Sequence, residues 1–245
     1  MTNSLWINSR PVAHRGLFDN KLVPENSTAS IKKAMDANFA IELDVSVTGD
    51  GKAIVFHDET LSRMTKNDGY VSGTPLTEIK KATLLGGNEH ILSLSEALSL
   101  IGGKVPVLLD IMPSSTPNFE LAIMEGVNGY KGDFAVCSSN PFILEWFKLN
   151  APQVKRGQRV SAFKKEKPSF AKKRLLRKMK YNNHSEPNFV ILKLEDYKKC
   201  GYKKMAKQGI PVILYSVKDK KGLRKAKELN LNFIFDSENV PLDEI

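Results

Sequence analysis

The stretch PVAHRG, residues 11–16, places an apolar run of proline, valine and alanine directly before a His-Arg-Gly triplet. We interpret the apolar run as the end of a buried strand, and the triplet as polar groups presented where that strand stops. Similar short apolar runs recur along the chain, several of them without polar alternation. They occupy residues 41–45, 107–111, 134–137, 190–192, 212–214 and 233–235.

Helix-like segments fill most of the gaps between these runs, including residues 27–37, 94–101, 141–149 and 218–229. A weaker strand at residues 155–159 raises the expected number of strands to eight. Eight strand-helix units in a chain of 245 residues predict an α/β fold, a (β/α)8 TIM barrel, rather than an open sheet. The segment of about residues 50–87 interrupts this rhythm and predicts an insertion after the second strand, at the strand end where barrel active sites lie.

The composition, with 41% apolar residues, allows a substantial core, and no linker divides the chain, so residues 1–245 are expected to form a single domain. The first residues lack a signal-peptide pattern, and no apolar stretch is long enough to span a bilayer. We therefore expect a cytoplasmic protein. Cys137 and Cys200 lie far apart and are expected to be reduced thiols.

The charge balance, 37 basic against 27 acidic residues, gives a formal net charge of +10 and favours polyanionic partners in general. Much of the excess lies between Lys164 and Lys180, which is either a solvated surface segment or an interfacial helix on an anionic membrane surface. No basic motif interleaved with aromatic residues is present, so nucleic acid is not an expected partner.

Three carboxylates are candidates for one metal site. Glu42 and Asp44 are two residues apart on one predicted strand, so their side chains share a face, and Asp110 ends the third apolar run. Oxygen ligands without sulfur indicate a hard divalent cation, Mg²⁺ or Ca²⁺. Taken by themselves, Glu42 and Asp44 could be the solvent-facing residues of an edge strand, and Asp110 could cap a helix.

His14 and His57 also stand at predicted strand ends, and either could act as a general acid or base near neutral pH. Arg15 would match a phosphate oxyanion. The His57-Asp58 pair could also be an ordinary turn. Because all these groups fall at strand ends of one predicted barrel, together they indicate metal-assisted phosphoryl transfer.

Four motifs, AHRG (13–16), PENS (24–27), ELDV (42–45) and HDETLSRMTKNDGYV (57–71), resemble the signature of the glycerophosphodiester phosphodiesterase family in their order and spacing. The resemblance implies a TIM barrel that cleaves glycerophosphodiesters to glycerol 3-phosphate and an alcohol. It assigns acid-base catalysis to His14 and His57, metal ligation to Glu42 and Asp44, and phosphate or substrate binding to Arg15 and Glu25. Asn26 or Ser27 could instead cap the following helix.

The chain departs from the family pattern at Asp110-Ile111-Met112, where Glu-x-Lys is usual. Aspartate at this place is similar to the arrangement in spider-venom-type phospholipases D, so Asp110 is expected to bind the metal. Met112 cannot supply the positive charge of lysine. This leaves three hypotheses: a glycerophosphodiester hydrolase, a lysophospholipid or phospholipid head-group phosphodiesterase at a membrane surface, and a catalytically weak barrel that binds phosphodiesters.

Overall fold

In the computed structural model, strands and helices alternate along residues 6–161, 175 and 178–245, which are the residues that the structure describes. Each of the seven apolar runs overlaps a strand, as does the weaker predicted strand at residues 155–159, and the successive strands that these form pair in parallel in both parts of the chain. This is the order of a (β/α)8 TIM barrel, so the predicted fold class is confirmed.

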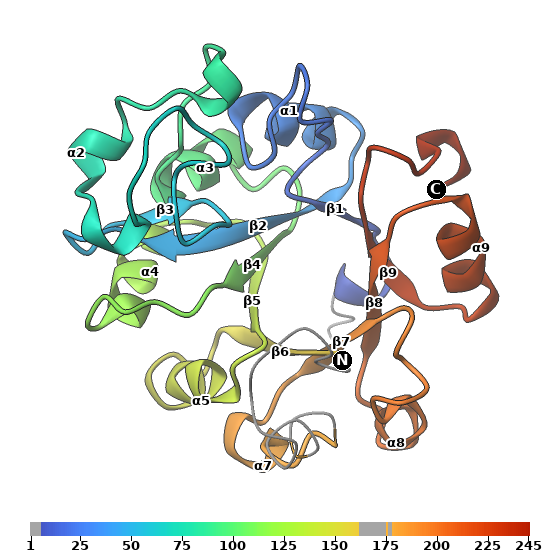
Figure 1. Cartoon of the computed structure of the whole chain (residues 1–245). Helices are drawn as coiled ribbons and strands as arrows, with labels where there is room; N and C mark the ends of the chain where they lie inside the picture. Colours follow the sequence, from blue (N-terminus) through green and yellow to red (C-terminus); the bar gives the residue numbers. More distant parts are fainter. Residues whose placement is uncertain (1–5, 162–174, 176–177) are drawn as a thin grey trace. The chain divides into compact units, whose positions relative to one another are not determined.

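The chain divides into two compact units, and the unit of residues 13–134 contains all the predicted site residues. Its elements are β1 (Val12–His14), α1 (Thr28–Asp36), β2 (Ala40–Val47), β3 (Ala53–Val55), α2 (Leu76–Ile79), α3 (Leu94–Ile101), β4 (Val107–Ile111) and α4 (Phe119–Val127). Strand β2 pairs parallel with β4 and antiparallel with β3, and α1 and α4 pack against β2 (Figure 1). Helices α1 and α4 therefore both cover the central strand of this unit.

The pairing of β2 with β4 brings the acidic residues together. Asp44 lies directly opposite Asp110 in the parallel register, and Glu42 lies opposite Leu108. Every residue of both strands is buried. Because side chains alternate between the faces of a strand, Glu42, Asp44 and Asp110 project from the same face.

The turn after β1 is fixed by its contact with the start of α1. Ser27 caps α1, and Ser30 completes a capping box with it. Gly16 has a φ of +79°, and a Cβ placed on it would lie 2.7 Å from the backbone of Ser30. The backbone of the turn can approach α1 this closely because glycine has no side chain.

Gly16→Ala is expected to destabilise the protein by about 2–5 kcal/mol, because the left-handed backbone conformation and the steric clash with Ser30 both disfavour alanine. Gly51→Ala is the matched control, because Gly51 has a φ of +73° and open space around it. The measurement is urea unfolding of both variants. Equal losses of unfolding free energy would contradict the steric role of Gly16.

The segment between β2 and α3 has a hydrophobic core of its own. It contains β3, α2 and the short 3-10 turns Val71–Gly73 and Leu84–Gly86. The buried residues of this core are Ile54, Phe56, Leu61, Met64, Val71, Ile79, Leu84 and Ile91. We call this segment the inserted segment. Its core supports the loop that carries His57.

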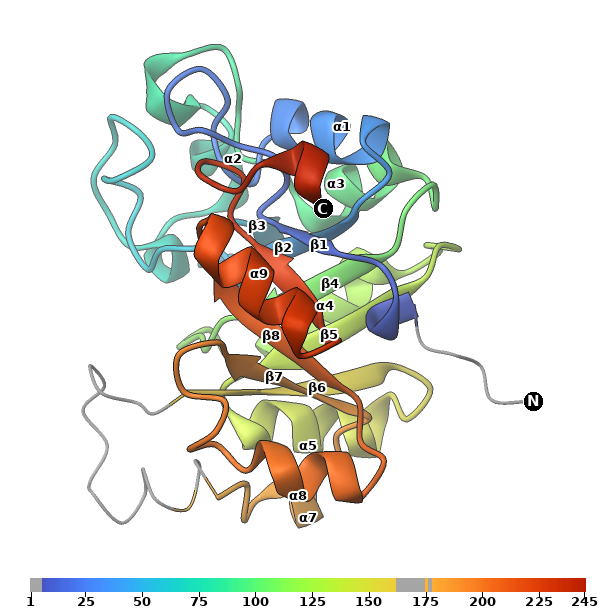
Figure 2. The same cartoon turned by 90° about the vertical axis from the view of Figure 1, so that its right-hand side faces the viewer.

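The second unit comprises residues 135–245 together with residues 1–12. Its elements are β5 (Phe134–Ser138), α5 (Pro141–Asn150), β6 (Lys155–Val160), α7 (Asn182–Ser185), β7 (Phe189–Lys193), α8 (Tyr202–Lys207), β8 (Val212–Val217), α9 (Lys220–Glu228) and β9 (Asn232–Phe235), with 3-10 turns Trp6–Asn8 and Leu242–Glu244. Strands β5 to β9 pair in succession, and α9 packs on β8 and β9 (Figure 2). Cys137 and Cys200 are both buried and are not joined in a disulfide.

Within the described part of the chain, no helix is long and apolar enough to cross a membrane. Most of the basic stretch between Lys164 and Lys180 lies outside the described residues. Its contact with an anionic membrane surface stays a prediction, as do the cytoplasmic location and the expectation that nucleic acid is not a partner.

Candidate active site

The three predicted metal ligands form one buried cluster. Oxygen atoms of Glu42, Asp44 and Asp110 all lie within 4.8 Å of one another, and none of the three residues is more than 2% exposed. One oxygen of the cluster, Oδ1 of Asp44, is buried and makes no hydrogen bond with any described residue. Buried carboxylates at this spacing repel each other unless a cation lies among them, so the donor set fits a hard divalent ion.

Arg15 is held against the cluster by two ion pairs. Its Nε lies 2.9 Å from Asp44 Oδ2, and its Nη1 lies 2.8 Å from Glu25 Oε1. Burial alone would lower the pKa of Arg15, but the carboxylates of Asp44 and Glu25 outweigh it and raise that pKa. The guanidinium therefore stays charged beside the acidic cluster.

Asn26 orients Asp44 from the segment that precedes α1. Its Nδ2 donates to Asp44 Oδ2 at 3.0 Å, and its backbone N–H donates to the carbonyl oxygen of Arg15. Of the two residues proposed as helix caps, Ser27 is the cap, whereas Asn26 belongs to the site. Burial would raise the pKa of Asp44, but Arg15, His57 and His14 outweigh it and hold the pKa below its ordinary value.

The two histidines come from different elements and contact different carboxylates. His14 ends β1, with its Nε2 3.9 Å from Glu42 Oε2. His57 follows β3 in the inserted segment, and its Nδ1 lies 2.6 Å from Asp58 Oδ1. Because Asp58 engages Nδ1, the other ring nitrogen of His57, Nε2, is the one available for proton transfer. When protonated, both imidazoles favour the ionised form of Asp44 and help to hold its pKa below the ordinary value.

Arg63 links Asp58, the partner of His57, to Glu25. Sequence analysis did not predict a role for Arg63. Its Nη2 donates to Glu25 Oε1 at 2.6 Å, and its Nε donates to Asp58 Oδ2. Burial would raise the pKa of Glu25 and of Asp58, but the hydrogen bonds from Arg63 outweigh it and lower both. The position of Arg63 five residues after Asp58 in the fourth motif was the available signal.

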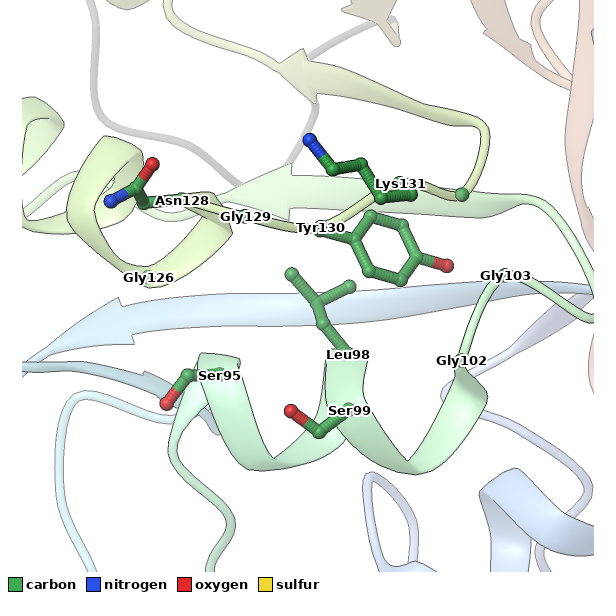
Figure 3. Close-up of a pocket in the computed structure, with 11 residues that line it drawn as sticks. Ser95, Leu98, Ser99, Gly102, Gly103, Gly126, Asn128, Gly129, Tyr130 and Lys131 are labelled. Carbon is green, nitrogen blue, oxygen red and sulfur yellow. The ribbon is translucent and has the colours of Figure 1, made fainter.

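Two hollows in the same unit differ in their lining. The larger, of about 560 Å³, lies between α3 and the turn after α4, where Leu98 points toward the ring of Tyr130 (Figure 3). None of the predicted site residues lines it. The smaller, of about 320 Å³, is lined by His57, Asp58 and Met112. The smaller hollow is therefore the one that adjoins the candidate active site.

A model of the glycerophosphoryl diester phosphodiesterase family matches residues 14–238. The chain belongs to this family. The match begins at His14, which ends β1, and runs through both units. The resemblance inferred from the four motifs is thereby confirmed.

Similar proteins carry the same family name. A glycerophosphodiester phosphodiesterase of Caldanaerobacter subterraneus is 38% identical over 159 residues, which cover 60% of this chain and 64% of that protein. A glycerophosphodiester phosphodiesterase of Bacillus subtilis is 39% identical over 103 residues, which cover 41% of this chain and 34% of that protein. The chain thus spans less than two thirds of the length of these relatives.

Solved structures of the family match over nearly the whole chain. The structure of an Oleispira antarctica phosphodiesterase in complex with the product sn-glycerol-3-phosphate is 26% identical, covers 97% of this chain and 95% of its own, and has a TM-score of 0.78. A glycerophosphodiester phosphodiesterase of Thermotoga maritima has a TM-score of 0.70 at 21% identity, with 93% of each chain covered. The latter is a likeness of fold alone.

Proposed function

We propose that this family member is a metal-dependent phosphodiesterase that hydrolyses glycerophosphodiesters to glycerol 3-phosphate and an alcohol. The observation that carries the proposal is the buried cluster of Glu42, Asp44 and Asp110 with His14 and His57 beside it. The family match through both units supports one catalytic domain over residues 1–245. The names of the relatives support the substrate class.

The divalent cation, Mg²⁺ or Ca²⁺, would be held by Glu42, Asp44 and Asp110. When bound, it would polarise the phosphoryl oxygens and neutralise the charge that develops on them. Arg15 forms ion pairs with Asp44 through Nε and with Glu25 through Nη1, and we assign its Nη2 to a phosphate oxygen. Glu25 would fix this guanidinium in place.

One histidine would accept a proton from the attacking water as the bond from the water oxygen to phosphorus forms. The other would donate a proton to the alcohol oxygen as its bond to phosphorus breaks. We assign the second role to His57, because the hollow of about 320 Å³ beside it offers space for the alcohol. His14 then assists the attack.

A second candidate is a catalytically weak barrel that binds phosphodiesters without turnover, and the observation that favours it is Met112. This residue lines the hollow beside His57, where the family resemblance expects the charge of a lysine. A third candidate, head-group hydrolysis at a membrane surface, rests on the basic stretch between Lys164 and Lys180.

The test is release of glycerol 3-phosphate from a panel of glycerophosphodiesters, and of head groups from lysophospholipids in vesicles, with Mg²⁺, Ca²⁺ or EDTA. We expect turnover of the soluble diesters that EDTA abolishes. Asp110→Asn is expected to weaken Mg²⁺ or Ca²⁺ binding by about a hundredfold or more, measured by calorimetry, because it removes a buried ligand charge.

The control for Asp110→Asn is Asp36→Asn, which changes an exposed aspartate of α1 outside the site. Turnover that persists in EDTA would contradict metal dependence. A folded protein that binds the cation and the diesters without releasing any product would favour the barrel without turnover. Release from vesicles alone would favour the membrane-surface enzyme.

A further inference from the structure

The hollow beside His57 has two walls that come from different parts of the chain. One wall is the loop after β3, with Asp58, Glu59 and Tyr70. The other is the end of β4 and the loop that follows it, with Met112 and residues 113–115. Met112 extends the β2–β4 pairing, since its backbone N–H donates to the carbonyl oxygen of Val45 at 3.1 Å. Both walls are therefore anchored by the strands that carry the active site.

The lining of this hollow contains no lysine or arginine among the described residues, although the chain carries a net charge of +10. Its carboxylates are Asp58 and Glu59. Arg63 and His57 already pair with Asp58. Glu59 is exposed, and its carboxylate has no hydrogen bond or ion pair with any described residue. The negative charge of Glu59 is thus available to a ligand in the hollow.

Backbone pairing in this loop brings the strand segment of Tyr70 beside that of Glu59, and both residues line the hollow. The backbone N–H of Val71 donates to the carbonyl oxygen of Glu59 at 2.9 Å, and Thr60 and Tyr70 form an isolated antiparallel bridge. Tyr70 is 64% exposed and lines the hollow. An aromatic face together with a carboxylate is the pairing that recognises an ammonium group.

From this lining we infer that the hollow receives the alcohol half of the diester and selects alcohols that carry an ammonium group, such as choline. The inference rests on the proposed function, in which His57 faces the alcohol oxygen. Glu59 supplies the opposite charge, and Tyr70 supplies the aromatic face. Met112 supplies an uncharged, polarisable surface where a lysine would repel the cation.

The test compares glycerophosphocholine with its 3,3-dimethylbutyl analogue, in which carbon replaces the quaternary nitrogen and only the charge is lost. We expect the wild type to hydrolyse the choline ester with a kcat/KM at least about fivefold higher. Glu59→Gln and Tyr70→Leu are each expected to reduce this ratio by about two- to fivefold, and Tyr70→Phe is expected to retain it. Glu78→Gln, an exposed glutamate of α2, is the control.

Equal kcat/KM values for the two esters would overturn the inference while leaving the proposed function intact. A ratio unchanged by both Glu59→Gln and Tyr70→Leu would also overturn it. If neither ester is hydrolysed, the proposed function fails, and the affinities of the two esters, measured by calorimetry, decide the inference separately. A choline ester that binds more tightly than its neutral analogue, with the difference lost in Glu59→Gln, supports selection of the cation.

Discussion

His57→Ala is expected to lower kcat for every hydrolysed glycerophosphodiester by about 10²–10⁴-fold, the usual contribution of a positioned general acid. The imidazole is held in a fixed orientation, because Asp58 contacts its Nδ1 at 2.6 Å and Arg63 in turn pairs with Asp58. Removing the ring removes this positioned proton donor. Metal binding should be unchanged, since the three carboxylates stand on β2 and β4. The measurements are steady-state kinetics and calorimetry with the divalent cation.

The control is His184→Ala, which alters an exposed histidine of α7 that pairs with Glu145. It should leave kcat within about twofold of the wild type, as a surface substitution away from the site does. A His57→Ala enzyme that retains wild-type kcat would remove His57 from the reaction. A loss that is fully explained by weaker metal binding would assign His57 to the metal site instead.

Arg15→Met is expected to cost about 3–5 kcal/mol of unfolding free energy in EDTA, the typical effect of removing one partner from a buried ion pair. The variant keeps a side chain of similar length but removes the ion pairs of Arg15 with Asp44 and Glu25, while Glu25 keeps Arg63 and Asn20 as partners. Urea unfolding monitored by circular dichroism measures the loss. Adding the divalent cation should recover part of it, because the ion would replace the missing positive charge.

The control for Arg15→Met is Lys52→Met, which breaks an exposed pair of 3.4 Å with Glu125 in the same unit. An exposed pair contributes about 0–1 kcal/mol, so this variant should unfold close to the wild type. Equal losses in the two variants would show that Arg15 is not a structural counterion of the carboxylates.

The sequence predicts the position of the acidic cluster well because strand geometry fixes it. Two residues of spacing put Glu42 and Asp44 on one face, and a parallel register brings Asp110 beside them. His14 is placed by the same logic, since it ends β1. The family motifs add His57, whose position depends on the fold of the inserted segment rather than on a simple strand period.

The contacts that support these residues could not be predicted in the same way. Asn26 reaches Asp44 only because its backbone adopts a left-handed φ of +57°, which a sequence pattern does not specify. Arg63 contacts Glu25 across 38 residues, and that pairing depends on how the loop after β3 folds back. Such contacts follow from loop conformation, which has no periodic signal in the sequence.

The inserted segment has a hydrophobic core of its own, so the residues to which we assign the choice of alcohol are supported separately from the predicted metal ligands. The carboxylates belong to the strands, whereas Glu59 and Tyr70 lie on the loop supported by that core. Under the proposed assignments, substitutions on the surface of this loop are expected to change which alcohol is accepted without disturbing the predicted metal ligands. Directed evolution aimed at residues 59–72 should broaden or invert head-group preference while retaining hydrolysis.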